Sequence, residues 1–287
     1  MSVTLIQKSN LRTKIEKPKL GLVLAGGSLT GAAYKIGGLK ALNDYLINRK
    51  LTDFDIYLGI SAGSVLAVPL AGGIPPEEML ASIDGKSLHF SQLSPYELYR
   101  PNWMEYLSRP LKYFYGQLSY LPSIMWDIAK ASPGLKDDFF SNCKKLITNP
   151  TYSNYEELTK PFLKIAYSDR HIPSFGEMLP SGIFNNEPIE KYLKHNLKRN
   201  KMPNNFRVLK RMRGKSLYMV AMDLDTSGRV IFGPDEKNDV NISEAAQASS
   251  CIPGFYKPTR LKGVDYIDGG VRRTGNISVA FDKGADL

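Results

Sequence analysis

One short run of the sequence has the residue types of an activated serine. Residues 59–63 are Gly-Ile-Ser-Ala-Gly, the pattern G-x-S-x-G, and they lie between a predicted strand and a predicted helix. A sharp turn there lifts the Ser61 hydroxyl out of the chain, which requires small neighbours. The first N–H groups of the following helix and the positive end of its dipole would stabilise an oxyanion. The pattern predicts a nucleophilic serine, and a merely tight strand–helix turn is the alternative.

A second glycine-rich turn, Gly26-Gly27-Ser28-Leu29-Thr30-Gly31, lies upstream between another predicted strand and helix. It is not a Walker phosphate loop, because Ala32 stands where that pattern has lysine. It also fails the dinucleotide pattern G-x-G-x-x-G, because residue 28 is serine. A turn after a neighbouring strand can instead aim backbone N–H groups at Ser61, so we expect an oxyanion hole here. Close packing of helix on strand is the alternative.

A nucleophilic serine needs a general base. The chain has three histidines: His89, His171 and His195. None follows residue 195, so the Ser–Asp–His order of α/β-hydrolases is absent; His171 and His195 remain alternatives, although neither follows a predicted strand. The other candidate is Asp268, at a predicted strand end before Gly269 and Gly270. A carboxylate with a pKa of about 4 must be held close and partly desolvated to act on a hydroxyl. An aspartate that caps its own turn is the alternative.

The elements that must position these residues alternate between strand and helix. Residues 20–24 and 55–60 are uncharged or nearly so, as in strands buried on both faces, and helical spacing follows the first of them over 31–48. Another helix is expected from Ala62 and a further one from Pro75. Later strands are predicted at 162–167, 217–222 and 264–267, with a hairpin near 227–228 and a helix near 242–250. This order predicts an α/β fold with a mainly parallel sheet.

Two regions interrupt the alternation. Residues 1–18 are polar and predict a loose N-terminal arm, which leaves 19–287 as one domain. From about 86 to 160 the strand pattern stops, and residues 90–126 contain ten aromatic side chains. We expect a helical insert there, with helices broken at Pro95, Pro101, Pro110 and Pro122. Its rings suit a lid or an interfacial surface, and a helical cap packed on the sheet is the alternative.

Positive charge is concentrated in one segment. The 287-residue chain has a formal net charge of +10, and residues 191–215 contain ten Lys or Arg and no acid. Such a segment attracts an anionic membrane surface, a phosphate backbone or an acidic partner, and a solvated helix face is the alternative. The sequence contains no zinc finger, RNA-recognition signature or basic-zipper pattern, so nucleic acid is not an expected partner.

Composition excludes several further classes. Hydrophobic residues make up 43% and charged residues 23%, which argues against disorder. Cys143 and Cys251 cannot form a disulfide framework, and with three scattered histidines they give no zinc-binding spacing. Residues 1–20 lack the apolar core of a secretory signal, so we expect a cytoplasmic location with peripheral membrane association. The uncharged run 56–76 is punctuated by glycines, which favours a buried strand over a membrane span.

The glycine turn 26–31, the pattern at 59–63 and Asp268-Gly269-Gly270, in this order, resemble the patatin-like phospholipase family. Residues 248–258, Ala-Ser-Ser-Cys-Ile-Pro-Gly-Phe-Tyr-Lys-Pro, are similar to the family's segment before its Asp-Gly-Gly. The match runs from about Leu20 to the C terminus without the aromatic insert. The resemblance implies a three-layer α/β fold with a mainly parallel central sheet and helices on both faces.

The resemblance implies a lipid acyl hydrolase of the phospholipase A or lysophospholipase type, acting on phospholipid or another acyl-ester lipid. Ser61 would be the nucleophile and Asp268 its base, in a dyad without histidine that forms an acyl-serine intermediate. The oxyanion hole would consist of backbone N–H groups at Gly26, Gly27, Ser28 and Ala62. The motif glycines that support these turns would be Gly31, Gly59, Gly63, Gly269 and Gly270. Neither a metal nor a cofactor is expected.

The sequence departs from the family at the oxyanion turn, whose usual form is Gly-Gly-Gly-x-Arg/Lys-Gly. Ser28 replaces the third glycine, which costs about 1 kcal/mol if the backbone there needs a positive φ. Thr30 replaces the basic residue. The chain also stops at Leu287, where the family continues into a further strand, as a fragment would. Two other functions therefore stay open: a weak or inactive lipid-binding or regulatory relative, and a lipid acyltransferase. Headgroup, acyl chain and oligomeric state are left open as well.

Overall fold

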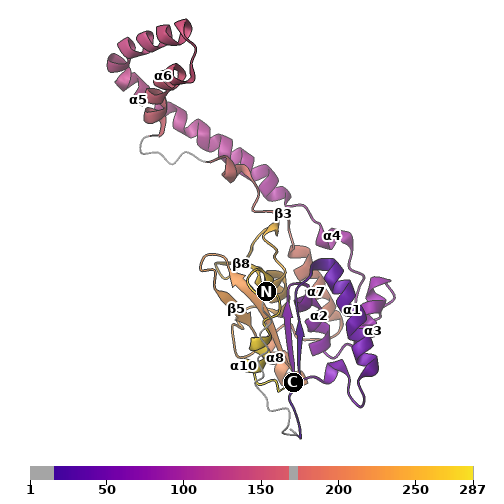
Figure 1. The fold of residues 1–287 in the computed structure, drawn as a ribbon. Coiled ribbons are helices and arrows are strands. Elements are labelled where there is room, and N and C mark those ends of the chain that lie inside the picture. The colour runs from indigo at the N-terminus through magenta and orange to yellow at the C-terminus, as the bar shows by residue number, and fades with distance from the viewer. Residues whose placement is uncertain (1–15, 168–173, 287) are drawn as a thin grey trace. The chain divides into compact units, whose positions relative to one another are not determined.

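A computed structural model of the chain describes residues 16–167 and 174–286 (Figure 1). The predicted arm 1–18 therefore lies almost wholly outside the described residues. The chain divides into two compact units. The first unit comprises Met1–Asn102 with Ser181–Leu287, and the second is Trp103–Pro180. Each unit is described by itself.

The first unit is built on a six-stranded sheet. Its parallel centre consists of β1 (Gly21–Leu24), β2 (Ile56–Ile60) and β4 (Ser216–Asp223), which lie in that order. Three further strands pair antiparallel with this centre or with each other: β5 (Arg229–Phe232), β7 (Thr259–Leu261) and β8 (Val264–Asp268). The predicted α/β sheet with parallel central strands is confirmed, and so is the hairpin, which joins β4 to β5. Outside this sheet, β3 (Gly182–Phe184) pairs parallel with β6 (Gly254–Tyr256).

The register of β4 brings the ends of two distant strands together. Strand β2 pairs with the first part of β4 and ends with Ile60 opposite Val220. Strand β8 pairs with the last part of β4, and its final residue Asp268 lies opposite Ala221. Strand β5 pairs with β4 residues 219–222, which overlap both stretches, so β5 occupies the other edge. Strand β8 therefore continues along the edge of β4 that β2 leaves, and their ends meet.

Helices cover both faces of this sheet, because side chains alternate between its faces along each strand. Leu217, Met219 and Ala221 of β4 belong to a large core with the buried faces of the helices on one side. These helices are α1 (Ser28–Tyr45), α2 (Ala62–Ala71), α3 (Pro76–Ile83), α7 (Glu187–Arg199), α8 (Phe206–Arg213) and α9 (Ile242–Ser249). Tyr218 and Val220 pack in a smaller core with α10 (Ile277–Asp282) on the opposite side. Figure 1 shows α1, α2 and α3 across the strands from α10.

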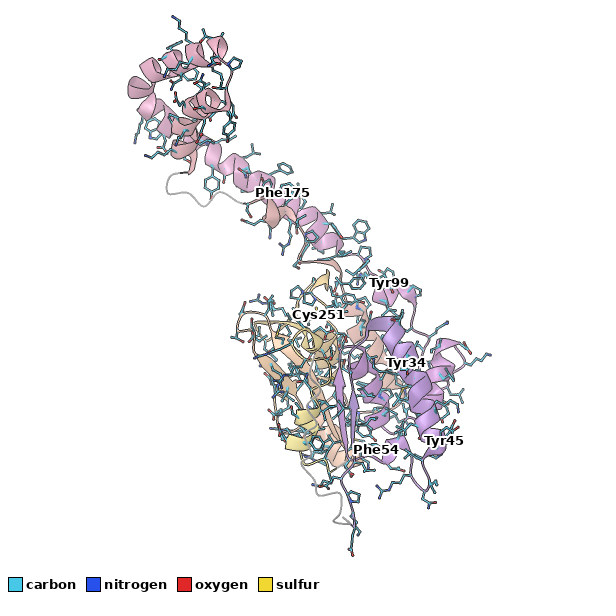
Figure 2. All side chains as sticks on the ribbon, in the orientation of Figure 1. Tyr34, Tyr45, Phe54, Tyr99, Phe175 and Cys251 are labelled. Atoms are coloured by element: carbon cyan, nitrogen blue, oxygen red, sulfur yellow. The ribbon has the colours of Figure 1, made fainter. Side chains whose placement is uncertain are left out.

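Helix α1 has one face buried in the core and another exposed to solvent. Ile36 and Leu39 are buried against the sheet, whereas Tyr34 and Tyr45 are each 84% exposed. Figure 2 shows both tyrosines on the outer side of the unit. The uncharged run 56–76 forms β2, α2 and the start of α3, as its glycines indicate. None of the helices in the described ranges combines the length and apolar character needed to cross a bilayer.

The second unit corrects two expectations. Helix α5 (Trp103–Thr148) continues through Pro110 and Pro122, so the prediction that these prolines break helices is wrong. Each proline removes one hydrogen bond, which a 46-residue helix can tolerate. Pro95 and Pro101 do mark boundaries, since Pro95 begins α4 (Pro95–Leu98) and Pro101 precedes α5.

The strand predicted at 162–167 is also wrong, because these residues end α6 (Tyr152–Tyr167). Helix α6 packs against α5, where Lys145 forms an ion pair with Glu157 at 3.5 Å and Asn142 donates to the Glu157 carbonyl at 3.4 Å. A mostly apolar run of six residues fits a strand and a helix equally well by pattern. Here the packing of α6 against α5 favours the helix.

Candidate active site

Ser61 lies in a strained turn between β2 and α2, with φ 55° and ψ −130°. Three other serine hydroxyls hold this turn. The Ser61 N–H donates to Ser249 Oγ at 3.0 Å, and the Ser61 carbonyl accepts from Ser64 Oγ at 2.6 Å and Ser250 Oγ at 3.2 Å. Strained backbone of this kind persists only where its surroundings hold it, and it is concentrated at functional sites. The turn has the strand–turn–helix geometry that presents a nucleophile.

The glycines that flank Ser61 allow α2 to begin directly against the sheet. A Cβ at Gly59 would lie 2.4 Å from Ser64 Cα, inside the first turn of α2. A Cβ at Gly63 would lie 2.1 Å from the Leu24 carbonyl oxygen, at the end of β1. No side chain fits at either position, so both glycines are required by close approach of the backbone.

Asp268 lies beside this turn and is 4% exposed. Its N–H donates to the Cys251 carbonyl at 2.8 Å, and its Oδ1 accepts from the Gly270 N–H at 2.7 Å. Burial raises the pKa of the Asp268 carboxyl, while the nearby Ser61 hydroxyl and the hydrogen bond from the Gly270 N–H oppose that rise. A Cβ at Gly269 would lie 2.4 Å from the Val220 carbonyl oxygen, so this turn is pressed against β4. The carboxylate is therefore desolvated and lies near the Ser61 hydroxyl.

The histidines lie elsewhere. His89 is exposed, and its Nδ1 contacts Asn200 Oδ1 at 2.7 Å. His195 is exposed on α7, and His171 lies outside the described residues. Neither His89 nor His195 lines the cavity next to Ser61.

The glycine turn at 26–31 adjoins Ser61. A Cβ at Gly26 would lie 3.3 Å from Ser61 Cβ, so this glycine touches the nucleophile candidate. Gly27 has φ 145° and Ser28 has φ 55°, which fulfils the condition under which Ser28 costs about 1 kcal/mol. Ser28 and Ala62 are the first residues of α1 and α2, so their N–H groups have no acceptor within their own helices. Free N–H donors of two helices thus lie beside Ser61.

Lys35 of α1 contacts this turn, and the sequence analysis missed it. Its Nζ donates to the Gly26 carbonyl at 2.9 Å and to the Gly31 carbonyl at 3.2 Å. Burial lowers the pKa of this lysine. The N–H and C=O of a trans peptide point in opposite directions, so holding the Gly26 carbonyl also fixes the direction of the Gly27 N–H. The sequence did contain a signal for this contact: Lys35 lies four residues after Gly31 on a predicted helix, a spacing that places the two residues side by side.

A cavity of about 440 Å³ opens beside Ser61. Ser28, Ser61 and Ala62 contribute to its lining, and the rest of its wall is mostly apolar. The apolar side chains come from α1, α2, α3, α7 and the segments 90–99 and 252–256, and they include Ile36, Val65, Leu66, Met79, Phe90 and Tyr99. Within the described ranges no group of three or more His, Cys, Asp or Glu side chains is arranged to hold a metal ion.

The family model of patatin-like phospholipases matches residues 22–281, nearly the whole chain. The chain belongs to the patatin-like phospholipase family. This patatin-like chain is 37% identical over 73 residues to the uncharacterized protein YjjU of Escherichia coli, a stretch that covers 25% of this chain and 20% of YjjU.

Two solved structures are also similar to the patatin-like chain. VipD from Legionella pneumophila has a TM-score of 0.40 and 18% identity, over 89% of this chain and 46% of VipD. ExoU of Pseudomonas aeruginosa, solved with SpcU, has a TM-score of 0.34 and 18% identity, over 82% of this chain and 38% of ExoU. The chain thus spans less than half the length of each of these relatives.

The backbone contact at the Ser61 turn predicts that Gly63→Ala lowers the free energy of unfolding by about 3 kcal/mol, because the new Cβ overlaps the Leu24 carbonyl. Gly37→Ala in α1 is the matched control, since a Cβ there meets no atom within 4 Å. The free energy of unfolding of this control should rise by up to about 1 kcal/mol, because alanine has a higher helix propensity than glycine. Urea unfolding of the two variants measures the difference, and equal stabilities would contradict the close approach.

Proposed function

We propose that this chain hydrolyses acyl esters of lipids, with Ser61 as the nucleophile and Asp268 as its base. The observation that carries the proposal is the shared edge of β4, where Ile60 and Asp268 lie opposite neighbouring residues. The nearness of the Ser61 hydroxyl to the buried carboxylate, which counters the rise of its pKa, supports the same assignment. A base of raised pKa accepts the hydroxyl proton more readily than an ordinary aspartate does.

The reaction follows from these positions. Asp268 takes the proton of the Ser61 hydroxyl as Oγ attacks the ester carbonyl, and N–H groups of the turn 26–28 and of Ala62 stabilise the oxyanion. Collapse of the tetrahedral intermediate expels the alcohol, which receives the proton from Asp268. A water molecule then attacks the acyl-serine, again with Asp268 as base, and releases the carboxylic acid and the free serine.

The apolar cavity supports an acyl chain as the group that is bound. It opens beside Ser61, and its wall offers aliphatic and aromatic surface with few polar groups. Burial of methylene groups against such a wall contributes about 0.8 kcal/mol each. Its volume of about 440 Å³ suits one fatty chain or part of one.

Helix α5 supports contact with a lipid surface. A stripe of exposed apolar side chains follows it at helical spacing, and their exposed fractions lie between 48% and 69%. The apolar stripe consists of Trp103, Leu107, Leu111, Phe114, Leu118, Leu121 and Met125. A helix of this pattern, with Lys112 and Lys130 among its polar residues, suits the boundary between headgroups and acyl chains. We therefore assign the insert to interfacial binding.

The basic segment 191–215 has less free positive charge to attract a membrane than its composition suggests. Lys191 pairs with Glu187 at 3.3 Å and Lys194 with Glu190 at 3.8 Å, and both acids precede the segment. Its remaining charges, on α7 and α8, can still attract anionic headgroups, and a solvated helix face remains the other interpretation.

One observation favours a second candidate function. Ser28 occupies a left-handed position that suits glycine, and Thr30 replaces the family's basic residue, so a less effective oxyanion turn would leave a lipid-binding relative with weak hydrolysis. An acyltransferase would use the same acyl-serine with an alcohol or lysolipid in place of water. Product analysis with added lysolipid separates transfer from hydrolysis.

The dyad predicts that Ser61→Ala reduces ester hydrolysis to background and that Asp268→Asn reduces kcat by about 10²- to 10⁴-fold. The first variant lacks the attacking oxygen, and the second lacks the base that accepts its proton. Hydrolysis of a p-nitrophenyl ester and of phosphatidylcholine measures them, with circular dichroism to check folding. Ser119→Ala and Asp225→Asn are exposed controls of the same chemical type. Full turnover in either site variant would refute the dyad.

The contact of Lys35 with the glycine turn predicts that Lys35→Met lowers kcat about tenfold with little change in KM, because the oxyanion donors lose their fixed direction. Lys40→Met is the matched control, since Lys40 lies on the same helix and pairs only with Asp44 among its recorded contacts. Steady-state kinetics of both variants decides. Equal kcat values for the two would remove Lys35 from the site.

The apolar stripe of α5 predicts that replacing Leu111, Phe114 and Leu118 with serine weakens vesicle binding about 100-fold, because three apolar side chains no longer enter the lipid. Co-sedimentation with phosphatidylcholine–phosphatidylglycerol vesicles measures binding. Tyr34→Ser with Tyr45→Ser is the control, since both tyrosines are more exposed but lie on α1. Hydrolysis of a water-soluble ester should stay unchanged. Undiminished vesicle binding by the stripe variant would contradict the assignment.

A further inference from the structure

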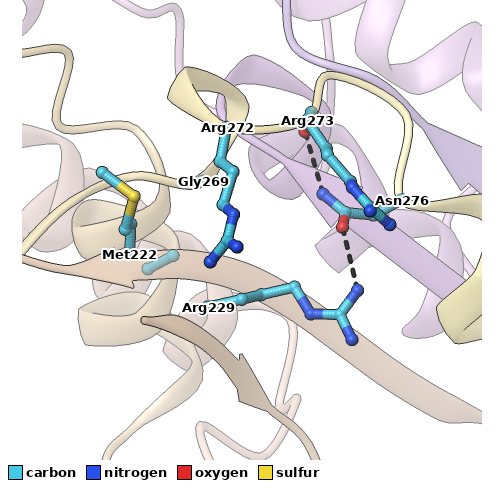
Figure 3. Close-up of a pocket in the computed structure, with 7 residues that line it drawn as sticks. Met222, Arg229, Gly269, Arg272, Arg273 and Asn276 are labelled. Carbon is cyan, nitrogen blue, oxygen red and sulfur yellow. Dashed lines mark hydrogen bonds between the residues drawn. The ribbon is translucent and has the colours of Figure 1, made fainter. Parts of the chain in front are cut away.

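A second cavity, of about 360 Å³, lies next to the turn that carries Asp268. Gly269, the residue after Asp268, lines it together with the end of β4. Three arginines face the same space: Arg229 at the start of β5, and Arg272 and Arg273 after Gly270. Figure 3 shows their side chains gathered above the ribbon of β4. We call this cavity the arginine pocket.

Neighbouring groups hold the side chains of Arg229 and Arg272 and the backbone of Arg273. Asn276 is 6% exposed, accepts a hydrogen bond from Arg229 Nη1 at 3.3 Å and donates one to the Arg273 carbonyl at 2.9 Å (Figure 3). Arg272 Nη1 donates to the Ser227 carbonyl at 3.3 Å. These contacts use only part of the donors, since each guanidinium carries five N–H groups.

The arginine pocket carries uncompensated positive charge. Among the described residues, none of the recorded ion pairs uses Arg229, Arg272 or Arg273. The acid at the end of β4, Asp223, accepts instead from the backbone N–H groups of Asp225 and Thr226. Three like charges around one cavity repel each other, so an anion that enters it is stabilised by all three.

We propose that the arginine pocket binds a phosphate group. The planar fork of a guanidinium matches two phosphate oxygens at once, and three such forks with spare donors suit a dianion better than a single negative charge. The pocket is larger than a phosphate alone needs, so it has room for the group that the phosphate esterifies. The phosphate belongs either to a lipid headgroup or to a small soluble molecule. The site is separate from the acyl cavity, and its existence does not require hydrolysis by Ser61.

Binding of inorganic phosphate tests the proposal directly. Isothermal titration at constant ionic strength, with chloride as the balancing anion, should show saturable binding to the full chain. Arg229→Gln, Arg272→Gln and Arg273→Gln should each weaken binding about tenfold, because each removes charge-assisted hydrogen bonds. Arg49→Gln and Arg260→Gln, at exposed arginines outside both the arginine pocket and the basic segment 191–215, should bind like the unmodified chain.

A vesicle assay identifies the source of the phosphate. If it is a lipid headgroup, vesicles with phosphatidic acid should bind the chain more tightly than vesicles with an equal fraction of phosphatidylglycerol. Inorganic phosphate should then compete, and the arginine variants should lose the difference. If the source is soluble, phosphate binds in the titration without any preference among vesicles. Failure of phosphate to bind in both assays, or equal losses in the Arg49 and Arg260 controls, would overturn the proposal.

The two proposals fail separately. Ser61→Ala should keep full phosphate binding, because the hydroxyl does not line the arginine pocket. The three arginine variants should keep covalent labelling of Ser61 by a fluorophosphonate, since none of these arginines touches the nucleophile. A folded chain that hydrolyses esters but binds no phosphate would refute only the pocket.

Discussion

The candidate active site depends on the pairing of two strands, β2 and β8, with one edge of β4. Strand β2 occupies its first part in parallel and ends opposite Val220, and β8 occupies its last part in the antiparallel sense, ending opposite Ala221. A serine and an aspartate that are far apart in the sequence thereby become neighbours along one ladder. A slip of one residue in β8 would turn Asp268 to the opposite face of the sheet, because side chains alternate along a strand. The proposed dyad therefore depends on the pairing register of β8 with β4.

Backbone strain and close backbone contact follow from that arrangement. Ser61 and Ser28 both have positive φ, and the hydroxyls of Ser249 and Ser250 hold the first of them. Such conformations persist because the surrounding structure over-determines them. The turn after Asp268 is held in a similar way, because Gly269 lies so close to the Val220 carbonyl that no side chain fits there. The same turn separates two cavities of opposite character, one apolar beside Ser61 and one cationic beside Gly269.

The sequence predicted the parts of the fold in which local pattern and tertiary contacts agree. The strands β1 and β2, the small residues at the turns and the helix near α9 were all visible as patterns, although β1 lies at the sheet edge and only its Leu24 is buried. The end of α6 was not, because a short apolar run fits a strand as well as a helix until its neighbour is known. Lys35 and the arginine pocket escaped notice because they depend on contacts rather than on a motif. Arg229 and Arg272 meet only after β4, β5 and β8 have paired.

The most direct test of the proposed dyad of Ser61 and Asp268 is the pH dependence of fluorophosphonate labelling at Ser61. The carboxylate must be ionised to accept the proton, and burial raises its pKa above the ordinary value. The labelling rate should therefore fall as the pH decreases through a midpoint above about 4. In Asp268→Asn the rate should be low and should show no such decrease. The same rate and the same pH profile in both proteins would contradict the account.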